Sequence, residues 1–111
     1  MAAITKPVQS YKTTFTSNVA GYGPHRAIMH LYEPANAKPI AEIRFYDAAV
    51  LGQHPNREDA YGMPVVGMSL SELSAIVDTL RNEKPISMRW HSDDKYFYIF
   101  TDREDVGEGE A

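Results

Sequence analysis

One segment of the chain has a helical period, and it constrains the fold more than any other feature. Over 70–81 the apolar side chains recur every three or four residues and form one stripe, which consists of Leu70, Leu73, Ile76, Val77 and Leu80. Ser69 can cap the free amides at the start of this helix, and Glu72 can complete a capping box. Because a single stripe must pack on an apolar surface, the rest of the chain has to supply that surface.

The remaining ordered segments are predicted to be strands, because they alternate or are rich in β-branched and aromatic residues. They lie at 8–17, 26–33, 39–47, 63–68, 85–91 and 95–101, with turns at 21–24 and 33–36 between the early ones. The order ββββαββ predicts an α+β domain in which a mainly antiparallel sheet of five or six strands is covered on one face by the helix.

Length and charge bound the organisation of the chain. Its 111 residues, 43% of them hydrophobic, predict one domain over 1–101. Residues 102–111 have almost nothing to bury and are predicted to form a disordered acidic tail. The tail holds five acids and one base of a chain whose net charge is −4, which leaves ten of each sign in 1–101. A strongly basic polyanion binder is excluded at the level of whole-chain charge.

The chain has no cysteine, which excludes disulfide scaffolds, thiolate nucleophiles and zinc ribbons. No stretch reaches the roughly twenty apolar residues that cross a bilayer, and the start lacks the features of a secretory signal. These observations predict a cytoplasmic protein without a membrane segment.

The last two strands are predicted to form a hairpin around Asp93 and Asp94. This register pairs Trp90 with Phe97 and Arg89 with Tyr98. One face of the hairpin then carries the core residues Ile86, Met88, Trp90, Phe97 and Ile99, while the other carries Arg89, His91, Tyr96, Tyr98 and Phe100.

The strands at 26–33 and 39–47 show the same alternation, so basic and aromatic side chains are predicted to gather on the sheet face opposite the helix. This aromatic-basic face consists of Arg26, His30, Tyr32, Arg44, Tyr46, Arg89, His91, Tyr96 and Tyr98. Interleaved arginines and tyrosines can neutralise the phosphates and stack the bases of a single strand. The predicted function is therefore single-stranded DNA or RNA binding. The alternative is a regulatory or assembly protein that binds a protein partner, or itself, through the same face.

Two segments resemble a known family. The run at 40–46 and the sequence 67–71, which leads into the helix, resemble the positive cofactor four and Whirly-type single-stranded DNA-binding domains. The resemblance covers about half of the chain; two strands follow the helix here, and lysine-rich binding strands are missing. It implies a homodimer that binds single strands along its sheets, with Lys12, Arg26, Arg44, Tyr46 and Arg89 as candidate binding positions.

No catalytic residue, metal site or cofactor is predicted. His25 and His30 are an odd number of residues apart in a strand and point to opposite faces, and the other two histidines lie in other segments. Ser69 lacks the final glycine of a nucleophile elbow. A homodimer is also expected because one helix leaves part of a sheet uncovered.

The connection at 48–62 is long for a compact domain. It could reach a ligand or partner through Gln53, His54, Asn56, Arg57 and Tyr61. The alternative is that 48–51 extend the third strand or form a turn of helix, and that the rest is a solvated crossing.

Overall fold

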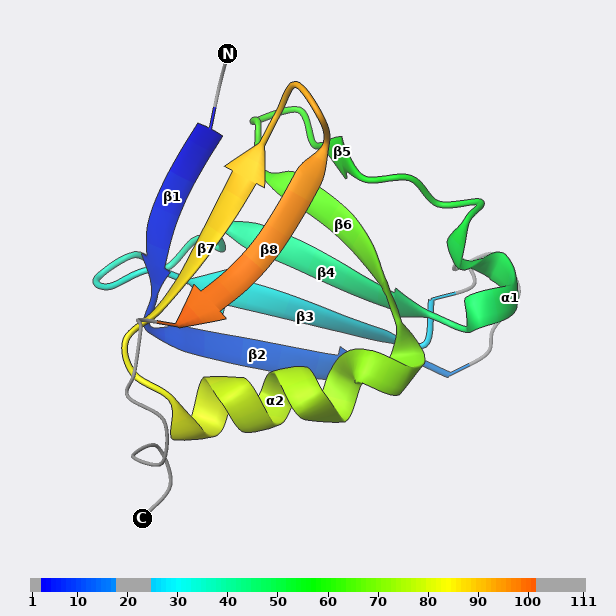
Figure 1. Ribbon diagram of the computed structural model, residues 1–111, viewed down its shortest axis with the longest axis horizontal. Coiled ribbons are helices and arrows are strands. Elements are labelled where there is room, and N and C mark those ends of the chain that lie inside the picture. The colour runs from blue at the N-terminus through cyan, green and yellow to red at the C-terminus, as the bar shows by residue number, and fades with distance from the viewer. Residues whose placement is uncertain (1–2, 18–24, 102–111) are drawn as a thin grey trace.

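The computed structural model describes residues 3–17 and 25–101. The predicted turn at 21–24 and the predicted acidic tail at 102–111 lie outside the described residues. The described chain has an α+β fold (Figure 1). None of its helices is long and apolar enough to cross a membrane.

The strands form two sheets, so the prediction of one mainly antiparallel sheet of five or six strands is wrong in the number of sheets. The smaller, antiparallel sheet has the order β1 (Ala3–Val8), β7 (Ile86–His91), β8 (Tyr96–Thr101). The larger has the order β2 (Ser10–Phe15), β3 (Ala27–Tyr32), β4 (Ala41–Tyr46), β6 (Pro64–Ser69), β5 (Arg57–Glu58). It is mixed, because β4 and β6 run parallel.

The first predicted strand, 8–17, is two strands that belong to different sheets. β1 pairs with β7 and β2 pairs with β3, and Gln9 between them donates its backbone N–H to Tyr32 O at 2.8 Å. Pro7 is tolerated in β1 because β1 is an edge strand, where a missing N–H costs least. The chain therefore passes from the small sheet to the large one within a single residue.

The segment between β4 and β6 explains the parallel pair. Parallel neighbours need a crossover of a dozen or more residues, and 47–63 supplies it. The segment contains the one-turn helix α1 (Ala48–Leu51) and the short edge strand β5. The helical alternative for 48–51 is thus confirmed.

The predicted helix is confirmed. A 3-10 turn, η1 (Leu70–Glu72), leads into α2 (Leu73–Asn82), and Ser69 Oγ caps the start by accepting the backbone N–H of Ser71 at 3.3 Å. Its apolar stripe packs against the core. That core lies between the inner faces of the two sheets and contains Ala27, Met29, Leu31, Ile40, Ala41, Ile43, Phe45, Val66, Met88, Trp90 and Phe97.

The β7–β8 hairpin has the predicted register. Trp90 pairs with Phe97, Arg89 with Tyr98 and Met88 with Ile99. The turn occupies 92–95, and Lys95 adopts a positive φ of 56°. The sequence pattern specified this pairing because a shift by one residue would exchange the core and outer faces.

Two hydrogen bonds connect the hairpin to the crossover segment. Trp90 is fully buried, and its indole Nε1 donates to Glu58 Oε2 at 2.7 Å. At the hairpin turn, Asn56 Nδ2 donates to Lys95 O at 3.0 Å. These contacts join the two sheets through side chains at a place where no backbone ladder runs between β5 and β7.

Replacing Glu58 tests this connection. Glu58→Ala leaves the buried Trp90 N–H without its carboxylate, so we expect the free energy of unfolding to fall by about 1–3 kcal/mol. Urea unfolding followed by the fluorescence of Trp90, the one tryptophan of the chain, measures it. Arg57→Ala, at the exposed neighbouring position, is the control and should change stability by less than about 0.5 kcal/mol. Equal losses in both variants would contradict the role of Glu58.

Candidate nucleic-acid interface

The structure divides the predicted aromatic-basic face between two surfaces. Arg89, His91, Tyr96 and Tyr98 lie on the outer face of the small sheet. Lys12, His30, Tyr32 and Arg44 lie on the outer face of the large sheet. Because the two sheets pack through their inner faces, these outer faces point to opposite sides of the molecule. The expectation of one continuous surface is therefore wrong.

The outer face of the small sheet, here called the hairpin face, carries four rings and one guanidinium. It consists of Arg89, His91, Tyr96, Tyr98 and Phe100. The ring centroids of Tyr96 and Tyr98 are 5.3 Å apart, and those of Tyr98 and Phe100 are 5.6 Å apart. The ring centroid of His91 lies 6.1 Å from that of Tyr96 and 5.9 Å from that of Tyr98. The sequence correctly predicted that these side chains share a face.

Arg89 is held against these rings. Its Nε donates to Thr5 Oγ1 of β1 at 2.7 Å, and its Nη1 donates to the Tyr98 hydroxyl at 3.3 Å. The guanidinium carbon lies 5.6 Å from the Phe100 centroid and 6.0 Å from the Tyr98 centroid. Sequence reasoning missed Thr5 because it placed no strand before residue 8.

The tilt of the rings limits how a base can bind. A base inserts between two rings only where their planes are nearly parallel. The planes of Tyr96 and Tyr98 are 45° apart and those of Tyr98 and Phe100 are 50° apart. Bases must therefore stack on the free ring faces, and Tyr96, which is 57% exposed, offers the most accessible ring of the hairpin face.

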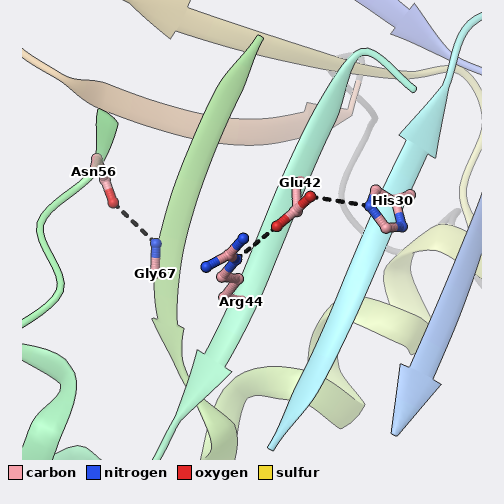
Figure 2. Close-up of polar contacts among 5 residues, drawn as sticks. All are labelled: His30, Glu42, Arg44, Asn56 and Gly67. Carbon is pink, nitrogen blue, oxygen red and sulfur yellow. Dashed lines mark hydrogen bonds and ion pairs between the residues drawn. The ribbon is translucent and has the colours of Figure 1, made fainter. Parts of the chain in front are cut away.

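On the opposite side, Arg44 is engaged with Glu42 (Figure 2). Its Nε donates to Glu42 Oε2 at 2.6 Å, and His30 Nε2 lies 3.1 Å from Glu42 Oε1. Burial acts to raise the pKa of Glu42, but the hydrogen bonds and charges of Arg44 and His30 outweigh it, so the pKa is lowered. Burial acts to lower the pKa of Arg44, and the contacts with Glu42 and Tyr46 raise it overall. Because the Arg44 guanidinium is already paired with the Glu42 carboxylate, it is a poor ligand for a phosphate.

Tyr46, another predicted binding residue, is packed rather than free. Only 5% of it is exposed, and its ring stacks on His54 at 4.3 Å with the planes 1° apart. His25 meets the same ring edge-on at 6.3 Å, and burial, together with the nearby Arg44 charge, lowers the pKa of His25. Tyr46 therefore cannot stack a base in this conformation.

The crossover segment closes over this end of the large sheet through Gly67. A Cβ at Gly67 would lie 3.2 Å from the His54 carbonyl oxygen and 3.3 Å from the Tyr46 ring. Its backbone N–H donates to Asn56 Oδ1 at 3.0 Å (Figure 2). His54 and Asn56, expected as possible ligand contacts, thus attach the crossover to the sheet. Arg26, another predicted binding residue, is also paired, because its Nη1 lies 3.2 Å from Asp47 Oδ2.

The described residues contain no group of three or more His, Asp or Glu side chains that could hold a metal ion. No protein-family model, curated protein or solved structure matches the chain.

The lowered pKa of Glu42 predicts a pH-dependent contribution to stability. A carboxylate whose pKa is lower in the folded than in the unfolded protein stabilises the fold above its unfolded pKa, and the contribution is lost as the pH falls through the folded pKa. At pH 7, Glu42→Gln should lower the free energy of unfolding by about 1 kcal/mol. The difference from wild type should shrink below about pH 4, where carboxylates titrate.

Urea unfolding across this pH range measures the effect. Asp78→Asn, at an exposed position of α2, is the control and should show little difference at any pH. A deficit in Glu42→Gln that stays constant into the acid range would contradict the assignment.

Proposed function

We propose that the chain is a small non-enzymatic protein that binds single-stranded DNA or RNA through the hairpin face. The observation that carries the proposal is the row of Tyr96, Tyr98 and Phe100 with the Arg89 guanidinium against it. Stacking on aromatic rings contributes roughly 1–3 kcal/mol per base and tolerates any sequence. Arg89 and His91 supply donors for the phosphates that connect such bases.

The charge of the chain sets the affinity that we expect for single-stranded nucleic acid. A net charge of −4 provides no long-range attraction for a polyanion, so affinity has to come mainly from stacking. Binding should therefore be modest and require low salt. The resemblance to the positive cofactor four and Whirly-type domains stays a prediction and agrees with this ligand class.

A fluorescence-anisotropy titration with single-stranded DNA and RNA at two salt concentrations tests the proposal. Affinity should fall as salt rises, because phosphate contacts release counterions. Tyr98→Ala should weaken binding about tenfold by removing one stacking ring, and Arg89→Ala should weaken binding and reduce the salt slope. Lys12→Ala removes an exposed cation from the other sheet and should leave the affinity unchanged.

Two results would overturn the proposal. One is no binding of either nucleic acid by the wild-type chain at low salt. The other is an equal loss in Lys12→Ala and Arg89→Ala, which would indicate attraction by overall charge rather than recognition by the hairpin face.

The second candidate is a regulatory or assembly protein that uses the same face against a protein partner or a second copy. The exposed Tyr96 ring favours it, because tyrosine is enriched at such interfaces. The sequence led us to expect an apolar sheet face that a second copy would cover. The small sheet and α2 already cover the core side of the large sheet, so this argument for a homodimer is lost. The homodimer and the cytoplasmic location stay predictions.

Sedimentation analysis tests whether the hairpin face binds a second copy of the chain. Self-association through the hairpin face would give a mass that rises with concentration, is insensitive to moderate salt and falls to that of the monomer in Tyr96→Glu. A monomer mass for the wild type throughout the concentration range would exclude the second copy as the partner.

A further inference from the structure

A small cavity lies between β1, the loop that joins β3 to β4, and the loop that precedes β6. It has a volume of about 270 Å³. The buried side chains of Met88 and Trp90 contribute its inner wall, while Ile4 and Lys6 of β1 and the loop between β3 and β4 form its sides. Tyr61 lies at its margin and is 95% exposed. The volume is just below the roughly 300–1,000 Å³ of sites for drug-sized ligands, so it fits a single planar ring system.

The backbone around Tyr61 is fixed although its ring is exposed. Asp59 Oδ1 accepts the backbone N–H of Tyr61 at 2.8 Å and that of Met63 at 2.9 Å. The Asp59 N–H donates to Met63 O at 2.9 Å, and Gly62 adopts a φ of +85°, which favours glycine. A rigid turn that presents an aromatic ring to solvent reduces the ordering cost of a stacking contact.

The sides of the cavity carry a donor and an acceptor close together. Lys6 Nζ lies 3.7 Å from Glu33 Oε1, and Asn36 Nδ2 donates to the same oxygen at 3.1 Å. Asn36 is itself fixed, because its Oδ1 accepts the Lys38 N–H at 3.0 Å. An ammonium beside a carboxylate complements a base edge that presents a carbonyl or ring nitrogen next to an N–H group.

The cavity lies on the inner side of the small sheet, whereas the hairpin face is the outer side of the same sheet. Ile4 pairs with Trp90, and Ala3 pairs with His91, which contacts Tyr96. Of the four exposed large hydrophobic side chains in 3–17 and 25–101, Ile4, Tyr61 and Tyr96 lie at the end of the molecule where the β7–β8 hairpin turns and Phe15 ends β2. Figure 1 shows the loop after β5 and the hairpin turn at the same end. A strand that stacks on Tyr96 has to pass around the small sheet to enter this cavity.

We infer that the cavity receives one unstacked base of the bound strand, with Tyr61 stacking on the bases at its mouth and Lys6 and Glu33 contacting the base edge. The inference rests on the proposed function and adds to it a site for a base, distinct from the row of rings. Single-stranded nucleic acids are recognised in this way when unstacked bases are placed on aromatic side chains and hydrogen-bonded at their edges.

The test uses the full chain and the anisotropy titration with a single-stranded DNA oligonucleotide. Tyr61→Ala should weaken binding about tenfold. Phe15→Ala, which removes a 73% exposed ring from the large sheet, is the matched control and should have no effect. With an abasic strand of the same length and phosphate number, Tyr61→Ala should make no difference.

A second readout reports on the cavity directly. Trp90 gives the chain one indole N–H signal in a proton–nitrogen correlation spectrum. Titration with a nucleoside monophosphate should shift this signal in the wild type and in Tyr98→Ala, because the cavity is separate from the row of rings. Glu33→Gln should reduce the shift.

The outcomes separate the two proposals. If the oligonucleotide binds and Tyr98→Ala weakens it but Tyr61→Ala does not, the cavity site is overturned and the proposed function stands. If the wild-type chain binds no oligonucleotide, the proposed function fails and the cavity site with it. If Tyr61→Ala instead lowers only the mass of a self-associated species, the occupant is a second copy and the inference is wrong.

Discussion

The rest of the structure depends on how the two sheets are held together around Trp90. Its ring fills the centre of the core, and its indole N–H requires an acceptor because a buried donor without a partner is costly. Glu58 of β5 meets that requirement from the far edge of the large sheet. One residue thus supplies apolar contact between the sheets and a directional link across them. An antiparallel sheet would need only a short connection between β4 and β6. The longer crossover segment is what brings Glu58 to Trp90.

The separation of the last hairpin from the large sheet has the largest effect on the candidate site. Because β7 and β8 form a sheet with β1 and not with β3 or β4, alternation along each strand no longer places every basic and aromatic residue on one surface. On the large sheet, Glu42 and Tyr46 contact their neighbours and leave a polar, internally matched surface. On the small sheet the rings contact one another and Arg89 lies against them. The two surfaces therefore differ in what remains available for a ligand.

The parts of the fold that could be predicted are those set by local periodicity. The helix over 70–82 and the pairing of Trp90 with Phe97 follow from apolar spacing within short windows. The two sheets and the parallel neighbours β4 and β6 depend on pairings between distant segments, which alternation does not specify. Tyr46 illustrates the limit: its position in the strand indicated an outward ring, and the crossover that covers it became visible only in three dimensions. The row of Tyr96, Tyr98 and Phe100 was predictable because it is contained in one hairpin.

The pairing of β1 with β7 has a consequence for how the protein is made. Ala3 lies opposite His91, so the small sheet joins the first described strand to one of the last two. Contacts so far apart in sequence slow folding, because the chain must close a long loop before they form. During synthesis the first strand has no partner until nearly the whole domain has left the ribosome. Until then, the core residues of the large sheet lack the Trp90 side chain that covers them, and the emerging chain exposes the surface that the finished protein hides.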